Sequence, residues 1–335
     1  MPELRRSTIS DVAEAANVSI STVSLVMNGK GPVSEETRAR VTEAAERLGY
    51  VPSRAAQGLV LRTTGNVGFV LREDHFTRAE PLYTRIFLGS EFEARHAGVY
   101  VLLATVPSVY QPRTDTPRFL RERAVDGVVV AGRVPDAFLD ELAATRLPVV
   151  LVDFAYRAWP SLGIDNAEGG RMAARHLLDR GRTRLAFVGA DPGHPSLAER
   201  LHGFEQGAGR PIVRLTSHDQ PTRATGRQLG RTLFADASER PDGVFCANDA
   251  LALGVLDAAR DAGLGVPDAL SIVGFDDVEG AAESSPPLTT LRVFKEQLGE
   301  LALRHLVDLV AARAGIARGA AQTRVLPELV VRGSS

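Results

Sequence analysis

The sequence predicts a small all-α unit followed by an α/β core of two doubly wound parallel-sheet subdomains. Residues 8–49 place apolar side chains at helical spacing between helix-capping residues. From residue 67 onward, short and uniformly apolar runs alternate with helical patterns, which is typical of parallel strands covered on both faces. A chain of 335 residues is also too long for a single hydrophobic core.

The first two predicted helices are short and lie close together in the chain. Thr8 begins the first helix, with Asp11 three residues later at the spacing of a capping box. Ser19 caps the second helix, which runs to about Asn28 and has Gly29 just beyond it. Because the linker is so short, the two helices must cross steeply, which is the pattern of a helix-turn-helix. The second helix contains no Lys or Arg.

A third helix is predicted over residues 34–49, and the stretch that follows is less regular. It contains "SRAAQGL", residues 53–59, which would form a helix too short to be stable alone. We therefore predict a headpiece over residues 1–50, a hinge helix and linker over 51–64, and a core over 65–335.

The core contains two series of strand-length apolar runs. The first series is "NVGFVLR", "GVYVLLATV", "VDGVVVAG" and "LPVVLVDF", and the second is "RLAFVGA", "GVFCAND" and "LSIVGFDD". In doubly wound sheets, ligands bind beyond the carboxyl ends of the strands. The polar residues at those ends are Asp153, Asn248, Asp249, Asp276 and Asp277.

Charge is nearly balanced along the chain, with a formal net charge of −2. Residues 1–62 carry eight basic and seven acidic residues, so the headpiece is only mildly basic. One headpiece should therefore bind DNA weakly, since phosphate neutralisation supplies much of the affinity. Dimerisation would double both the charge and the reading surface.

Composition also favours a cytoplasmic protein. Cys246 is the one cysteine, which excludes an internal disulfide and suits a reducing compartment. The sequence has no run of about 18 apolar residues, so no membrane span is expected. The arginines near the start are not followed by an apolar stretch, so no secretory signal is expected.

Enzymatic motifs are weak or missing. The sequence has no HExxH, no Cys/His cluster and no GxSxG. "GADPGHP" has the glycines of a phosphate loop but lacks its Lys-Ser/Thr ending. We therefore expect neither an enzyme nor a bound cofactor or metal.

These motifs bear a family resemblance. "TISDVAEAANVSISTVSLVMNGKGPVSEETRARVTEAAERLGYVPSRAAQGL" resembles the headpiece and hinge of the lactose/galactose repressor (LacI/GalR) family. "AERLHGF", "ANDALALGVLDAARDAGLGVPDALSIVGFDD" and "PPLTTLR" resemble that family's effector-binding core, which is similar to the periplasmic sugar-binding fold. The resemblance implies a dimeric, ligand-controlled repressor, with operator DNA and a small molecule as its partners.

The resemblance implies that the second helix enters the major groove, with Ile20, Ser21 and Leu25 facing bases. Leu59 would be an apolar wedge in the minor groove at the operator centre, although it could instead pack on the core. The residues that the resemblance assigns to DNA binding are Thr8, Ser19, Ile20, Ser21, Thr22, Ser24, Leu25, Asn28, Arg54, Ala56 and Leu59.

A second set of residues is implied for the effector. It combines a forked cationic donor, carboxylate acceptors and an amide, which together suit the vicinal hydroxyls of a sugar. Tyr83 and Phe154 would supply flat apolar faces, whereas Asp153 and Asp276 could alternatively be helix caps. The implied effector residues are Tyr83, Asp153, Phe154, Ser196, Arg200, Asn248, Asp276 and Val293.

Departures from the family pattern leave the ligand and the operator open. Leu25 stands where many members have Arg, and Val293 stands where several have a polar or aromatic pocket residue. The effector is predicted to be a sugar or a sugar derivative. The alternatives are a purine-like corepressor stacked on Phe154, a solute-binding protein, and a doubly wound enzyme.

The family architecture implies two lobes that exchange segments. We predict an N-lobe over about 65–162 and 293–319, a C-lobe over about 165–290 and 324–335, and crossings at 162–165, 290–293 and 319–324. A ligand between the lobes would change their angle and release the hinge from DNA. Arg200→Ala should then abolish the ligand response while leaving operator binding within a few-fold.

Overall fold

The computed structural model describes residues 7–27, 29, 31–50, 63–75, 82–190, 195–312 and 321–335. Its headpiece consists of α1 (Ile9–Ala16), α2 (Ile20–Met27) and α3 (Glu35–Arg47). The three helices bury one small core that includes Val12, Val23 and Val41. The helix-turn-helix and third helix predicted from the capping residues are therefore present.

Two parallel-dominated sheets and the helices between their strands form the rest of the described chain, as the alternating apolar runs predicted. Within the residues that the structure describes, the N-lobe sheet has six strands in the order β11-β5-β4-β3-β1-β2, and all of these pairs are parallel. Its strands are β1 (Asn66–Arg72), β2 (Tyr100–Val106), β3 (Val128–Ala131), β4 (Val149–Val152), β5 (Ser161–Ile164) and β11 (Gln322–Val325).

The C-lobe sheet has six strands among the described residues, in the order β12-β10-β9-β8-β6-β7. Its pairs are parallel except for β10 with β12, which is antiparallel. Its strands are β6 (Leu185–Ala190), β7 (Val213–Ser217), β8 (Gly243–Cys246), β9 (Ser271–Asp276), β10 (Thr289–Arg292) and β12 (Glu328–Val330).

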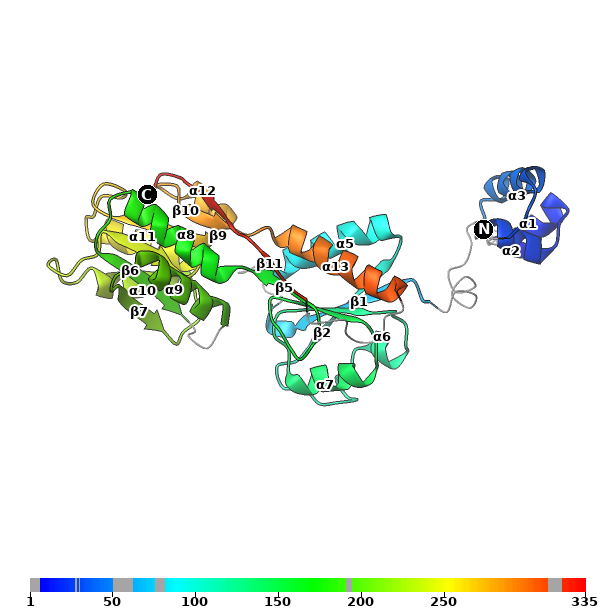
Figure 1. Cartoon of the computed structure of the whole chain (residues 1–335), viewed down its shortest axis with the longest axis horizontal. Coiled ribbons are helices and arrows are strands. Elements are labelled where there is room, and N and C mark those ends of the chain that lie inside the picture. Colours follow the sequence, from blue (N-terminus) through cyan, green and yellow to red (C-terminus); the bar gives the residue numbers. More distant parts are fainter. Residues whose placement is uncertain are drawn as a thin grey trace, which may run out of the picture.

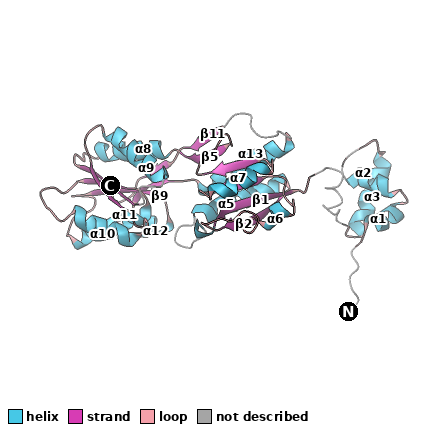
Figure 2. Ribbon diagram, turned by 90° about the horizontal axis from the view of Figure 1, so that it is seen from below, coloured by secondary structure: helices cyan, strands magenta, loops and turns pink. Residues whose placement is uncertain are grey.

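Helices cover both faces of each sheet (Figures 1 and 2). In the N-lobe, α5 (Leu82–Ala97) and α13 (Lys295–Ala311) cover one face, and α6 (Arg118–Arg121) and α7 (Asp136–Ala144) cover the other. The short η1 (Glu73–His75) follows β1. In the C-lobe, α8 (Asn166–Asp179) and α9 (Pro195–Ala208) lie opposite α10 (Arg223–Leu233), α11 (Asp249–Asp261) and α12 (Glu279–Glu283).

Burial on both faces explains the apolar runs. In β3, Val129 packs into one cluster with α5 and α13, and Val130 packs into another cluster with α6 and α7. Successive strand residues point to opposite faces, so an alternating pattern is not needed when both faces are covered. All four residues of β3 and all four of β4 are buried.

Helix pairs in the core approach each other closely through glycines. A Cβ on Gly203 of α9 would lie 1.9 Å from the carbonyl oxygen of Ala167 in α8, and one on Gly170 would lie 2.2 Å from that of Arg200. In the N-lobe, a Cβ on Gly89 of α5 would lie 1.9 Å from the carbonyl oxygen of Glu296 in α13. Each pair can therefore pack only while these positions lack a side chain.

The chain crosses between the lobes three times within the described residues (Figure 1). It passes from β5 to α8, from β10 to α13, and from β11 to β12. The segment 324–335 was predicted to be C-lobe, but Arg324 and Val325 belong to β11 and pair with β5 of the N-lobe. The third crossing therefore follows Val325, and the N-lobe includes all of β5 to Ile164. The sequence Gln-Thr-Arg-Val of this edge strand is mostly exposed, so no apolar run marks it.

Cys246 ends β8 and is completely buried. Burial, together with nearby Asp249, raises the pKa of its thiol well above the ordinary value. Within the described part of the chain, no helix is both long enough and apolar enough to cross a membrane.

Candidate functional site

Helix α2 presents an uncharged face to solvent. Val23 and Val26 point into the headpiece core, whereas the side chains of Ile20 and Leu25 are 50% and 40% exposed. Ser21 is also exposed, and Leu25 lies against Gly31, where an added Cβ would come within 3.2 Å of it. The residues predicted to face bases are thus on the solvent side of α2, and their contact with DNA stays a prediction.

Hydroxyl groups fix the starts of the first two helices. Thr8 forms a complete capping box with Asp11, and Asn17 turns the chain with a left-handed φ of 52°. Ser19 Oγ accepts from the backbone N–H of Thr22 at 3.1 Å and lies 2.8 Å from the hydroxyl of Thr22. The hydroxyl of Thr22 is therefore engaged in a local hydrogen bond with Ser19, and its contact with DNA stays a prediction.

Four of the residues predicted to contact DNA lie outside the residues that the structure describes. They are Asn28 in the headpiece and Arg54, Ala56 and Leu59 in the hinge. Ser24 lies on α2 and is half-buried.

A cavity of about 500 Å³ lies where the two lobes meet. Both lobes line it, and Tyr83, Asp153, Phe154 and Ser196 are the predicted effector residues in its wall. The lining residues are Arg72, Tyr83, Arg133, Asp153, Phe154, Ala155, Ser161, Leu162, Gly163, Pro195, Ser196, Glu199 and Arg324. A cavity of this size accommodates a small polar ligand.

Asp153 is the acceptor at the centre of this lining. It follows β4, and its φ of 68° is left-handed and costly for a non-glycine residue. Tyr83 of α5 donates to one carboxylate oxygen at 2.9 Å, and Ser196 of α9 donates to the other at 3.3 Å. Asp153 is therefore not a helix cap in this structure; it joins an N-lobe hydroxyl to a C-lobe hydroxyl.

Arg200 is held inside the C-lobe and is outside the cavity lining. Only 5% of its surface is exposed, and its guanidinium lies 3.6 Å from the centroid of the Phe275 ring. It donates to the Asn166 side chain at 2.9 Å and to the carbonyl of Ala247 at 2.6 Å, and it pairs with Asp276 at 3.5 Å. A buried cation requires such partners, and together they connect α8 with the ends of β8 and β9.

Three other predicted effector residues also lie outside the lining. Asn248 caps α11 by accepting from the N–H of Leu251 at 2.9 Å, and it donates to the carbonyl of Pro221 at 3.2 Å. Asp276 has a strained φ of 106° and a half-buried side chain, and Val293 is buried. The structure thus brings four of the eight predicted residues together at the cavity, and the ligand contacts of all eight stay predictions.

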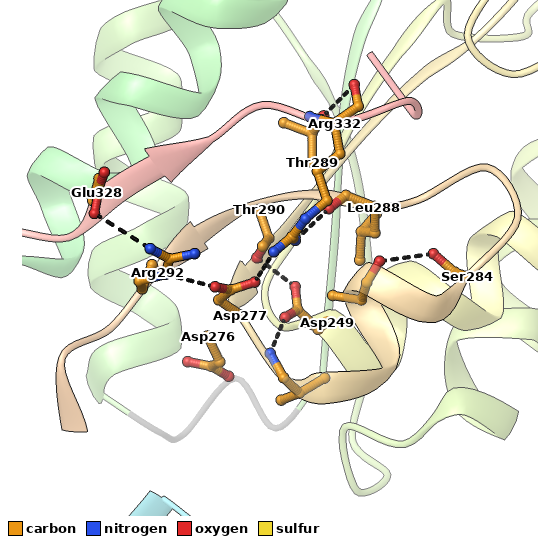
Figure 3. A network of polar contacts seen from close by, with 12 residues as sticks. Asp249, Asp276, Asp277, Ser284, Leu288, Thr289, Thr290, Arg292, Glu328 and Arg332 are labelled. Carbon is orange, nitrogen blue, oxygen red and sulfur yellow. Dashed lines mark hydrogen bonds and ion pairs between the residues drawn. The ribbon is translucent and has the colours of Figure 1, made fainter. Parts of the chain in front are cut away.

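A second polar network lies between the ends of β9 and β10 (Figure 3). Asp249 is fully buried and accepts from the Thr290 hydroxyl and from the N–H of Val278 at 2.9 Å. Burial and the nearby Asp276 raise the pKa of Asp249 to about 7. The carboxyl of Asp249 is thus poised between its neutral and charged forms at neutral pH.

Asp277 belongs to the same network, but its pKa is shifted in the opposite direction to that of Asp249. It accepts from Arg292 at 2.7 Å and from Arg332 at 2.6 Å (Figure 3). Burial raises its pKa, but the hydrogen bonds and charges of the two arginines outweigh burial, so the net shift is downward.

The prediction from sequence missed four charged residues of the cavity. Arg72 and Arg133 lie at or just beyond the ends of β1 and β3, where the strand-end rule would have found them if it had been applied to basic residues. Glu199 lies within α9 and Arg324 within β11, and neither carries a comparable sequence signal. Among the described residues, no group of three or more His, Cys, Asp or Glu side chains could hold a metal ion.

Comparisons with known proteins agree with this architecture. Residues 8–53 match the model of bacterial regulatory proteins of the lacI family, and residues 174–335 match that of the periplasmic binding protein-like domain. The chain is 32% identical to the HTH-type transcriptional repressor PurR of Mannheimia succiniciproducens, across 98% of both chains. The chain belongs to the LacI family. This LacI-family chain is a ligand-responsive, DNA-binding transcriptional regulator, as the family resemblance predicted.

Other LacI-family relatives cover the whole chain in the same way. The transcriptional regulator DegA of Bacillus subtilis is 32% identical over 98% of both chains. The Lac repressor dimer bound to operator and the anti-inducer ONPF superimposes with a TM-score of 0.78 at 26% identity, over 98% of this chain and 99% of that one. The complex of the regulator CelR with cellobiose gives a TM-score of 0.68 at 28% identity, over 98% and 100%.

Proposed function

We propose that this LacI-family protein is a cytoplasmic repressor that leaves its operator when a sugar or sugar derivative binds between the lobes. The observation that carries the proposal is Asp153, whose carboxylate receives hydroxyl donors from both lobes inside one cavity. A ligand hydroxyl that takes over these bonds would change how the lobes are held together. A change of lobe angle is then transmitted to the hinge.

The polar lining favours a polyol as the effector. Asp153, Glu199 and Ser196 offer acceptors and a hydroxyl, and Tyr83 and Phe154 offer aromatic surface. The structural relative CelR is known in complex with cellobiose, which supports this ligand class. The alternative is a purine-like corepressor stacked on Phe154, and it is supported by the relatives named PurR.

A ligand screen separates these two effectors. Sugars and nucleobases are tested by thermal shift on the full chain, and each hit is then tested for its effect on operator binding. A sugar that raises the melting temperature and weakens operator binding supports the proposal. By linkage, that sugar must itself bind less tightly when operator is present. A nucleobase that strengthens operator binding would establish the alternative instead.

We propose that α2 reads bases mainly through apolar contact. Ile20 and Leu25 are exposed, and without Lys or Arg the helix lacks the bidentate guanine contact. The expected half-sites have T·A pairs beneath Ile20 and Leu25, around a flexible central C-G step. Four basic residues are proposed to contact phosphates and so supply much of the affinity for DNA. They are Arg5, Arg6, Lys30 and Arg38, of which Arg38 lies in α3.

Leu25→Arg tests this groove contact. The substitution should shift preference at one symmetric base pair toward G by roughly 1–3 kcal/mol, the usual worth of a bidentate pair. Selection of operators from a random library measures the change. If the wild type and Leu25→Arg enrich the same base, Leu25 does not face the groove.

We propose a homodimer held through the core lobes that binds one pseudopalindrome. Large apolar side chains on α5 and the edge strand β2 support an N-lobe contact, since Leu88, Phe92, Tyr100 and Leu103 are 40–61% exposed. The two half-sites would then lie about one helical turn apart. Sedimentation should give a dimer at micromolar concentration, and a tetramer would contradict this assembly.

A further inference from the structure

Among the described residues that line the cavity between the lobes, positive side chains outnumber negative ones. Arg72, Arg133 and Arg324 lie there with two carboxylates of the described lining, Asp153 and Glu199. A guanidinium offers five N–H donors and no acceptor, and it matches the geometry of phosphate and carboxylate groups. One forked cationic donor with carboxylates and an amide suffices for the hydroxyls of a neutral sugar, whereas three arginines at one cavity exceed that set.

Two of these arginines come from neighbouring strands. Arg72 ends β1, and Arg133 follows β3 by two residues. The strands pair in parallel, with Leu71 opposite Ala131, so their carboxyl ends share one edge of the sheet. Arg72 and Arg133 therefore line the cavity from the same edge of the N-lobe sheet.

Both arginines retain donors for a ligand. Arg72 pairs with Asp74 through Nε, and the terminal nitrogen of Arg133 lies 3.7 Å from Asp136, which is longer than a hydrogen bond. The Arg133 side chain is 67% exposed, so it can turn toward a ligand without leaving a buried partner. Asp74 and Asp136 are not among the described residues that line the cavity.

Arg324 has a different environment. It donates to the carbonyl of Ile164 at 3.1 Å and pairs with Glu199 at 3.4 Å. Glu199 also accepts from the Asn166 side chain at 3.3 Å. Arg324 therefore pairs with a carboxylate of the cavity wall itself, whereas the carboxylate partners of Arg72 and Arg133 are not part of the described lining.

We propose that the effector is an anionic polyol, whose phosphate or carboxylate is bound by Arg72 and Arg133 and whose hydroxyls face Asp153, Ser196 and Glu199. This inference rests on the proposed function and narrows its ligand class. The anion would lie toward the ends of β1 and β3, whose arginines attract it, and away from Asp153, which follows β4 and would repel it.

The test is calorimetric titration of the full chain with matched ligands. The probes are glucose 6-phosphate, gluconate, glucose, cellobiose and inorganic phosphate, and the two anionic sugars distinguish a phosphate from a carboxylate source. We expect an anionic sugar to bind at least about tenfold more tightly than glucose, cellobiose or phosphate alone, as charge-assisted hydrogen bonds imply.

Substitutions locate the anion. Arg72→Gln and Arg133→Gln should each weaken binding of the anionic sugar by about tenfold or more. Arg121→Gln removes the same charge from an exposed position on α6 outside the cavity lining, and it should leave binding unchanged. Equal losses with Arg121→Gln would show a general charge effect and overturn the inference.

The remaining outcomes separate this inference from the proposed function. If glucose or cellobiose binds as tightly as the anionic sugars and releases operator, the effector is a neutral sugar. The inference of an anionic effector is then wrong, but the proposed function stands. If neither anionic sugar binds at millimolar concentration, the inference also fails. If the chain does not bind operator in any selection, the proposed function fails as well.

Discussion

The two sheets end in polar residues at the same topological place, yet these residues serve differently in the two lobes. At the N-lobe ends, Asp153, Arg72 and Arg133 line the cavity. At the C-lobe ends, Asp276 pairs with Arg200, and Asp277 pairs with Arg292 and Arg332. One lobe presents its strand-end charges to the cavity, and the other pairs them with arginines of its own fold (Figure 3).

The comparison shows that a polar residue after a strand does not identify a ligand contact by itself. Asp153 and Asp276 both have a positive φ, 68° and 106°, so an unfavourable backbone conformation occurs at both ends and does not distinguish them. The difference lies in their partners. Asp153 accepts from neutral hydroxyls that a ligand can replace, whereas Asp276 faces a buried guanidinium that cannot leave without a penalty.

The largest effect should follow from breaking the C-lobe network. Arg200→Ala removes a buried cation that contacts Asn166, Ala247 and Asp276, so it should lower the free energy of unfolding by about 3–5 kcal/mol. Arg133→Ala, at an exposed N-lobe position, should change it by less than about 0.5 kcal/mol. Urea unfolding of the full chain measures both.

The outcome decides between two roles for Arg200. A folded, equally stable Arg200→Ala protein that no longer responds to effector would make this arginine a ligand contact, as the family resemblance implies. A large loss of stability would make it chiefly a structural residue of the C-lobe.

A smaller effect should appear as a dependence of stability on pH. The pKa of Asp249 is about 7 in the folded chain and near 3.8 in the unfolded chain, so the folded state holds its proton more tightly. Stability from this group is therefore present at low pH and is lost as pH rises between about 4 and 7, at about 1.4 kcal/mol per unit.

Asp249→Asn should remove this slope. An amide can accept from the N–H of Val278 and donate to the Thr290 hydroxyl, which imitates the protonated carboxyl. The free energy of unfolding of the variant and of the wild type is measured in urea at pH 5 and at pH 7.5. The change between the two pH values is compared for the two proteins, which separates the contribution of Asp249 from that of other titrating groups. Parallel pH profiles would mean that Asp249 is charged throughout this range.

The smallest effect should come from the N-lobe side of the cavity. Tyr83→Phe removes a hydroxyl that the ligand must otherwise displace from Asp153, so the effector found by the screen should bind more tightly, by about 1 kcal/mol. Tyr110→Phe is the matched control, since its hydroxyl contacts Glu141 at 2.8 Å in the cluster with α6 and α7. Titration should show tighter effector binding for the first variant only; an unchanged or weaker affinity would mean that the ligand does not displace the Tyr83 hydroxyl from Asp153.

Most of the architecture followed from local sequence signals. Thr8, Ser19 and Ser34 precede real helices because their hydroxyls accept from the first turn. The buried strands were evident because both of their faces are covered. Strand β11 was missed because a mostly exposed edge strand does not need apolar residues, so its sequence shows no apolar run.

The site was less predictable, for a physical reason. The family resemblance supplied Tyr83, Asp153, Phe154 and Ser196, which do line one cavity. It could not reveal that Arg200 is enclosed by C-lobe partners, because those partners come from three separate elements. It also passed over Arg72 and Arg133, whose proximity depends on the pairing of β1 with β3.

The single thiol of the chain can serve as a chemical probe of local opening in the C-lobe. Cys246 is enclosed at the end of β8, and its raised pKa keeps it protonated, so a thiol reagent can react only after the lobe opens locally. When closing is faster than the reaction, the labelling rate reports how often this opening occurs. No other cysteine in the sequence competes for the reagent, so one rate constant follows the C-lobe alone, with and without effector or operator.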